Sequence, residues 1–165
     1  YKLKNIPKNI FLGFKIPEGR GDISKLKLKN KVVNYVDESY NSNPLSLKTA
    51  LINFASINSR KNFKHVLLGD MLELGKDTIN HHSSMTNTIN KLNIDKVHIY
   101  GKYIKKTYEG LKENKKGLVL NNIHEINYLI NKKLSNNDYL MVKGSNSTGL
   151  YKQSQILKLN KINAL

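Results

Sequence analysis

Short apolar runs alternate with longer amphipathic segments from about residue 31 to the end of the chain. The β-rich runs are 31–36, 65–69, 95–101, 117–120 and 138–144, and each is followed by a segment expected to be helical. Those helical segments are 43–57, 81–92, 103–111, 122–134 and 150–159. Five consecutive βα units predict an α/β fold with a mostly parallel sheet and helices on both faces.

Local signals support the boundaries of two of these helices. Asn43 suits an N-cap and Pro44 the first helical position. Asn122 and Glu125 have the spacing of a capping box. The residues before position 31 do not follow the alternation. PEGRGD reads as a loop, and ISKLKLKNKVVNYV as a hairpin that turns at Lys29 to Lys31.

Length and composition suggest one domain of ordinary size, since the chain has 165 residues. The sequence has no apolar stretch of the length that spans a bilayer, so no membrane association is expected. The first residues lack the pattern of a signal peptide, and the chain has no cysteine. We therefore expect a cytoplasmic protein without disulfides.

The formal net charge of +16 raises the question of nucleic-acid binding. The chain has 26 Lys and 23 Asn but only 2 Arg, and the lysines are scattered along it. Phosphate and base recognition favour the planar fork of arginine, so we expect no nucleic-acid partner. The same scarcity makes Arg20 informative, because lysine is the usual cation here.

Polar groups collect directly after the predicted strands, where ligands bind in open parallel sheets. The segments are 37–43 after the first strand, GDMLELG (69–75) after the second, Gly101-Lys102 after the third and KGSNSTG (143–149) after the last. Simpler roles remain open: Asp37 or Glu38 as helix caps, Asn43 as a cap in any case, and Lys143 as a surface lysine. His81 and His82 are adjacent and cannot both face one metal ion in a helix, so we expect no metal site.

The chain contains neither GxxxxGK[ST] nor GxGxxG, so it lacks the usual backbone cradle for nucleotide phosphates. We expect a module that works with another domain.

Four segments resemble motifs of the Mur ligases, and among these the branch that adds D-Ala-D-Ala. VDESYNSNPLSLKTAL is similar to the DDSYNANP motif of that branch, and VLLGDMLELG followed by His82 to its GDM-ELG segment. LMVKGSNSTGLY resembles the VKGSRS segment, and IPEGRGDI the short GR motif at the hinge into the third domain. The segments occur in the family's order.

The resemblance implies the third, Rossmann-like domain of a three-domain enzyme. Residues 1–24 would be the end of the central domain and the hinge, and 25–165 the C-terminal domain. The implied partners are ATP, UDP-N-acetylmuramoyl-tripeptide, D-Ala-D-Ala and the other two domains, in a monomeric enzyme. Mg²⁺ would be bound mainly by the central domain, and this chain alone would be inactive.

The resemblance also implies two sets of site residues. The ATP set is Arg20, Asp37, Glu38, Tyr40, Asn41 and Asn43. The dipeptide set is Asp70, Glu73, Lys143, Ser145 and Ser147. Lys143 and the Ser145/Ser147 loop would hold the dipeptide carboxylate, and Asp70 or Glu73 would hold an ammonium or orient the loop. The chain departs from the family at two positions. Glu38 stands where Asp is usual, and Asn146 stands where Arg is usual.

Three alternatives remain open. A receiver-like signalling domain also has an acidic pair after its first strand, but here Gly101-Lys102 occupies the place of its phosphorylated Asp. Another Mur ligase or a folylpolyglutamate synthetase would share the fold, but neither typically carries the DSYNANP motif together with the GDM-ELG segment.

Overall fold

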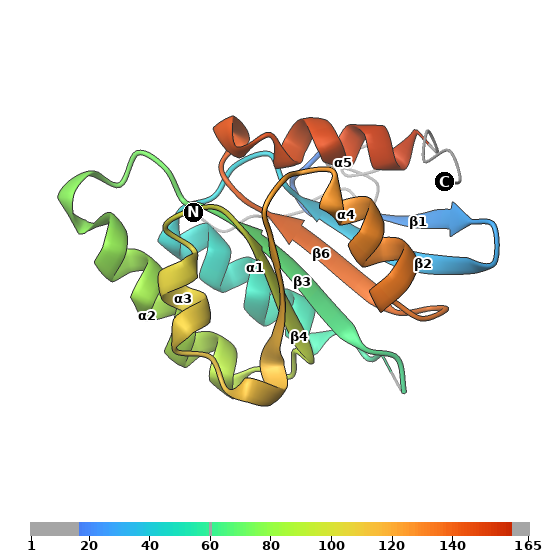
Figure 1. Ribbon diagram of the computed structural model, residues 1–165, viewed down its shortest axis with the longest axis horizontal. Helices are drawn as coiled ribbons and strands as arrows, with labels where there is room; N and C mark the ends of the chain where they lie inside the picture. Colours follow the sequence, from blue (N-terminus) through green and yellow to red (C-terminus); the bar gives the residue numbers. More distant parts are fainter. Residues whose placement is uncertain (1–16, 60, 160–165) are drawn as a thin grey trace, which may run out of the picture.

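The computed structural model describes residues 17–59 and 61–159. Most of the predicted hinge segment 1–24 lies outside these residues. A six-stranded sheet forms the centre of the molecule, with strand order β1-β2-β6-β3-β4-β5 (Figure 1). The strands are β1 (Asp22–Leu28), β2 (Lys31–Glu38), β3 (Lys64–Gly69), β4 (Lys96–Tyr100), β5 (Lys116–Leu120) and β6 (Tyr139–Lys143).

Strand pairing confirms the predicted mostly parallel sheet with an N-terminal hairpin. β1 and β2 are antiparallel, with Asp22 opposite Asp37 and Leu28 opposite Lys31, and Lys29 and Asn30 form the turn. All other neighbouring strands are parallel. The carboxyl ends of β2, β6, β3, β4 and β5 therefore meet at one edge, as the sequence analysis requires.

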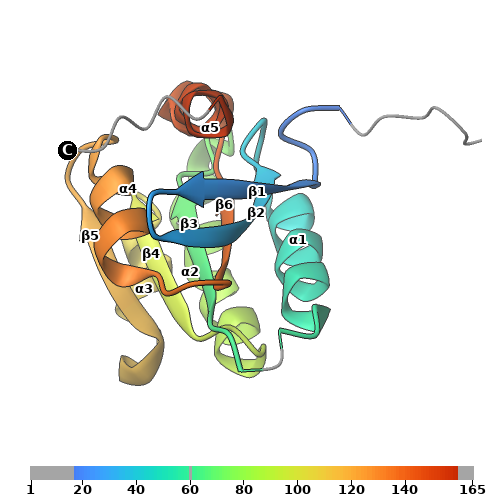
Figure 2. The same cartoon turned by 90° about the vertical axis from the view of Figure 1, so that its right-hand side faces the viewer.

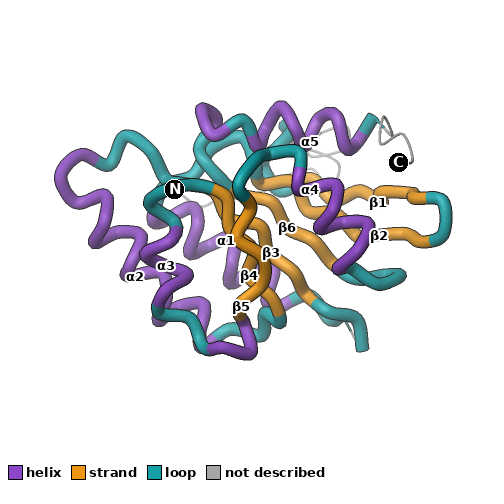
Figure 3. The backbone as a smooth tube through the Cα atoms, viewed as in Figure 1, coloured by secondary structure: helices purple, strands orange, loops and turns teal. Residues whose placement is uncertain are grey.

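Helices cover both faces of the sheet, which is best seen in the backbone tube of Figure 3. Residues of α1 (Pro44–Ser56), α2 (Thr78–Lys91) and α3 (Lys105–Glu109) line one apolar core with Val66, Leu68, Val97 and Ile99 of the sheet. Residues of α4 (Glu125–Tyr128), the π-helical η3 (Leu129–Lys133) and α5 (Leu150–Lys158) line the other with Leu67, Leu140 and Val142. Alternate positions of the central strands face opposite cores, and β3 is buried at every position.

Short 3-10 turns complete the described elements: η1 (Gly75–Asp77), η2 (Glu113–Lys115) and η4 (Asn146–Thr148). Within 17–59 and 61–159, no helix combines the length and apolarity needed to cross a membrane.

Three helices differ from the predicted bounds. α2 begins at Thr78 because η1 leads into it, and Ile79 in its first turn is exposed, so the apolar pattern started later. α3 is only five residues long, because the backbone N–H groups of Lys102 and Ile104 bind the Asp70 carboxylate instead of continuing a helix backwards. Segment 122–134 divides into α4 and η3.

Candidate functional site

Loops from three strands meet at the carboxyl edge of the sheet, and Lys143 at the end of β6 links two of their segments. Its Nζ lies 3.4 Å from Glu38 Oε2 and donates to the Asn41 carbonyl oxygen at 2.9 Å. The Lys143 side chain is buried. Burial lowers the pKa of Lys143 and Arg20 lowers it further, although the Glu38 carboxylate opposes both effects. Lys143 therefore contacts groups of the 37–43 segment and holds that segment against β6.

Ser145 links the third loop to the other two. Its hydroxyl accepts from the Leu72 N–H at 2.9 Å and donates to the Ser42 carbonyl oxygen at 3.2 Å. Its own N–H donates to the Asp70 carbonyl oxygen at 2.9 Å. The predicted segments 37–43, 69–75 and 143–147 are thus joined by direct hydrogen bonds.

A cavity of about 210 Å³ lies between these three loops. It is lined by Tyr40, Asn41, Leu72, Glu73, Ser145, Asn146 and Ser147. Glu73 has a φ of 63°, a left-handed conformation that costs a non-glycine residue free energy. The fold holds this exposed carboxylate at the cavity despite that cost.

Arg20 and Tyr40 form a second feature of the same edge. The Arg20 guanidinium carbon lies 4.4 Å from the centre of the Tyr40 ring, and Tyr40 packs edge-on against Tyr151 of α5. The Tyr40 N–H donates to the Gly19 carbonyl oxygen at 3.0 Å. Gly19 has a φ of 72°, and a Cβ there would lie 2.9 Å from the Tyr40 nitrogen, so glycine is required for this approach.

Asp37 lies at the end of β2, but its side chain is fully buried. One carboxylate oxygen lies 2.7 Å from Lys158 Nζ, and the other accepts from the N–H and hydroxyl of Ser39. These contacts engage both oxygens within the fold.

Asn43 is the N-cap of α1. Its side chain accepts from the Ser46 N–H at 2.8 Å, while the Ser46 hydroxyl accepts from the Asn43 N–H at 3.0 Å. This reciprocal pair is a capping box, with Pro44 at the first helical position as expected.

Asp70 fixes the loop that follows β4. Its carboxylate accepts from the N–H groups of Lys102 at 2.9 Å and Ile104 at 2.8 Å. Gly101, directly before Lys102, has a φ of 141°, and a Cβ there would come within 2.4 Å of the carboxylate. Of the two roles weighed for Asp70, its contacts are those of a loop-orienting residue.

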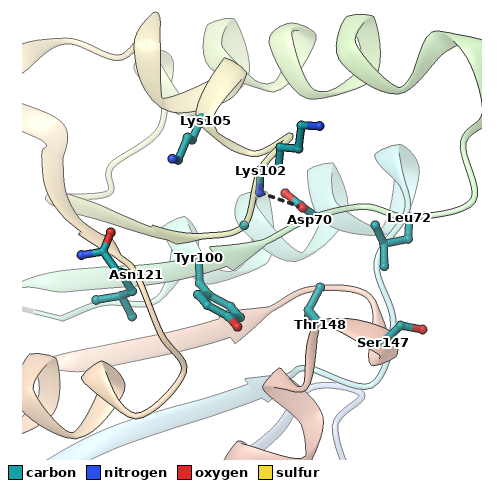
Figure 4. Close-up of a pocket in the computed structure, with 10 residues that line it drawn as sticks. Asp70, Leu72, Tyr100, Lys102, Lys105, Asn121, Ser147 and Thr148 are labelled. Atoms are coloured by element: carbon teal, nitrogen blue, oxygen red, sulfur yellow. Dashed lines mark hydrogen bonds between the residues drawn. The ribbon is translucent and has the colours of Figure 1, made fainter.

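The Asp70 loop forms one wall of a larger cavity of about 440 Å³, shown in Figure 4. Its lining residues are Asp70, Leu72, Tyr100, Gly101, Lys102, Lys105, Leu120, Asn121, Ser147 and Thr148. Leu72 and Ser147 line both cavities, so the two are neighbours along the edge. Gly101-Lys102 was predicted from the sequence to lie at this edge, but Lys102 was not assigned to a site. The prediction missed Lys105 and Asn121, whose side chains carry no motif.

His82, on α2, supports the GDMLELG loop from beneath. Its Nε2 accepts from the Met71 N–H at 3.0 Å, and its Nδ1 donates to the Thr78 carbonyl oxygen at 2.7 Å. Both ring nitrogens are thus used in the fold.

Comparison with known proteins identifies the family of this chain. Residues 23–146 match the family described as "Mur ligase, glutamate ligase domain". A UDP-N-acetylmuramoyl-tripeptide--D-alanyl-D-alanine ligase of Buchnera aphidicola is 34% identical over 126 residues, which cover 73% of this chain and 25% of that protein. The ligase of the same name from Rickettsia prowazekii is 26% identical over 83% of this chain and 29% of its own length.

Solved structures show the same fold. MurF from Thermotoga maritima, in complex with ADP, has a TM-score of 0.67 at 20% identity and covers 88% of this chain and 32% of its own. MurF from Acinetobacter baumannii has a TM-score of 0.68 at 20% identity, covering 87% and 31%. This chain spans a quarter to a third of the length of these four proteins. On the family match and the Buchnera relative, the chain belongs to the Mur ligase family, as its glutamate ligase domain.

Proposed function

We propose that this chain is the C-terminal domain of the ATP-dependent ligase that adds D-Ala-D-Ala to UDP-N-acetylmuramoyl-tripeptide, a step of peptidoglycan precursor synthesis. The observation that carries the proposal is the hydrogen-bonded junction of three motif segments at one sheet edge, through Lys143 and Ser145. The same segments carry the resemblance to the D-Ala-D-Ala-adding branch. The names of the two curated relatives support that branch.

In the proposed reaction, the tripeptide carboxylate attacks the γ-phosphorus of ATP, and ADP leaves. The D-Ala-D-Ala amine then attacks the acyl phosphate, inorganic phosphate leaves and the amine loses a proton. This chain supplies binding and orientation rather than the reacting groups. It works as a monomer in the cytoplasm with the N-terminal and central domains of the same enzyme.

Arg20 and Tyr40 are assigned to the nucleotide. Arg20 is exposed beside the Tyr40 ring, where its planar fork suits a phosphate and the ring suits a base. Glu38 and Asn41 remain assigned to ribose and base. Asp37 and Asn43 act indirectly, since their side chains hold Ser39 and the start of α1.

The dipeptide is assigned to the two neighbouring cavities. Glu73 serves its amine end, and Ser147 with Lys102 and Lys105 its carboxylate, while Lys143 and Ser145 hold the surrounding loops. Lys102 and Lys105 are exposed cations that line the larger cavity, and ammonium groups pair readily with a carboxylate.

Magnesium is assigned mainly to the central domain. No group of three His, Asp or Glu side chains within 17–59 and 61–159 is placed to hold a metal ion.

Growth of a bacterium depleted of its own D-Ala-D-Ala-adding ligase tests the proposal. The full-length gene that contains this chain should restore growth. The same gene ended just before the codon for residue 17, which removes the described domain, should not. An expressed, soluble full-length protein that fails to restore growth would contradict the proposed function.

A further inference from the structure

A charged cluster beneath the nucleotide loops joins α5 to the hairpin. Asp22 of β1 and Asp37 of β2 are direct neighbours in the strand register. Lys158, the last residue of α5, lies 3.0 Å from Asp22 Oδ2 and 2.7 Å from Asp37 Oδ2. Figure 2 shows α5 lying over this hairpin. We call Asp22, Asp37 and Lys158 the Lys158 clamp.

The second oxygen of each aspartate holds a backbone segment of the candidate site. Asp22 Oδ1 accepts from the Gly19 N–H at 2.7 Å, next to Arg20. Asp37 Oδ1 accepts from the Ser39 N–H at 3.1 Å, next to Tyr40. The clamp therefore connects the turn that carries Arg20 to the loop that carries Tyr40.

Two backbone hydrogen bonds complete the connection. The Gly21 N–H donates to the Asp37 carbonyl oxygen at 2.7 Å, and the Tyr40 N–H to the Gly19 carbonyl oxygen at 3.0 Å. These bonds join the backbone on either side of Arg20 to the segment 37–40, and the Arg20 side chain contacts the Tyr40 ring.

Without the Lys158 ammonium, two carboxylates would face each other, and that of Asp37 is wholly buried. A buried charge without a partner is costly, and adjacent like charges repel. The hairpin end and the Gly19 turn would then move apart or admit water, which would reduce the repulsion between the two carboxylates. Burial lowers the pKa of Lys158, but its hydrogen bonds to Asp37 and Asp22 raise it by more, so the clamp lysine stays charged.

We propose that Lys158 is a positioning residue for nucleotide binding, which acts through Asp22 and Asp37 to set Arg20 against Tyr40. This inference rests on the proposed function, because that assigns Arg20 and Tyr40 to ATP.

Lys158→Met in the full-length ligase tests the inference. The kcat/KM for ATP should fall about tenfold, the effect of losing one charge-assisted contact, while the KM for D-Ala-D-Ala stays within about twofold. Lys158→Arg should restore most of the ATP affinity because it keeps the charge. Lys152→Met, on the exposed side of the same helix, is the matched control and should change nothing.

Amide hydrogen exchange in the 165-residue chain gives a second readout that needs no activity. In Lys158→Met, the amides of Gly19, Ser39 and Tyr40 should exchange faster, whereas those of β3 and β4 should not. If that variant fails to fold, Asp22→Asn, which removes one carboxylate charge, should accelerate exchange at Gly19.

Unchanged exchange at the three amides, or equal acceleration throughout the sheet, would overturn the inference. An equal rise in KM for both substrates would do the same. A wild-type enzyme without ligase activity would refute the proposed function, and the exchange data would still decide whether the clamp orders these loops.

Discussion

Charged and polar side chains at the sheet edge fall into two groups. Arg20 and Glu73 are exposed; Glu73 lines the smaller cavity, and Arg20 lies over the Tyr40 ring. Asp37, Asp70 and Lys143 are buried and bind backbone groups or other charges. The sequence predicted that these residues gather at one edge, because strand ends in a parallel sheet must meet. It did not separate the groups, because burial depends on contacts such as Lys158 with Asp37, which are 121 positions apart.

Arg20→Lys in the full-length enzyme should lower turnover about ten- to a hundred-fold, since charge-assisted bonds contribute roughly 1.5–3 kcal/mol each. Lysine keeps the charge but loses the bidentate fork and the flat contact with the Tyr40 ring. Steady-state assays with varied ATP would measure the change, with thermal unfolding to verify an intact fold. Unchanged turnover and ATP dependence would show that Arg20 is only a solvated loop residue.

Acid stability should depend on His98, which lies away from the candidate site. Burial lowers the pKa of His98 to about 3, and the charges of His65, Lys96 and Lys133 act in the same direction. The unfolded chain takes up this proton near pH 6.5, so unfolding binds protons between these values and stability falls as the pH drops from 6.5 toward 3.

Urea unfolding of the chain and of His98→Gln from pH 7 to pH 4 would measure this effect. The wild-type free energy of unfolding should fall more steeply with acid, by up to about 1.4 kcal/mol per pH unit. Some slope should remain in the variant, because burial also lowers the pKa of His65. Identical slopes in the two proteins would contradict the account.

At the scale of elements, strands were predicted more closely than helices. The predicted strand 138–144 contains β6 (Tyr139–Lys143), because dense apolar runs between polar turns have few alternative structures. The shortened α3 could not be foreseen, since its start is set by the distant Asp70 carboxylate. Similarly, nothing in the apolar spacing of 122–134 marks the change from α4 to η3.

Asn43→Ala should destabilise the chain by about 1 kcal/mol, since it removes the side-chain half of the α1 capping box. Asn43→Asp should recover most of this loss, because aspartate caps as well as asparagine. Thermal and urea unfolding would compare the three proteins. An alanine variant as stable as wild type would mean that the cap contributes nothing. A large change in the KM for ATP in the stable aspartate variant would restore Asn43 to the nucleotide site.

At the scale of the whole molecule, the two cavities and the Arg20–Tyr40 contact lie on one edge of a single sheet. The chain spans 25% of the Buchnera ligase that it matches, and we propose that it completes a site formed with the other domains of the enzyme. Sequence motifs identified the edge and the family. They could not reveal the cavity walls from Lys105 and Asn121, which only the folded sheet brings together.

Product formation by the purified full-length protein is a direct test of the proposed function. The enzyme, ATP, Mg²⁺, UDP-N-acetylmuramoyl-tripeptide and D-Ala-D-Ala would be incubated together, and the nucleotide-sugar products weighed by mass spectrometry. The account predicts a product heavier than the tripeptide substrate by one dipeptide less one water, with one ADP released per product, and no product from the 165-residue chain alone. Addition of a different amino acid, ADP release that does not depend on D-Ala-D-Ala, or product from the chain alone would contradict it.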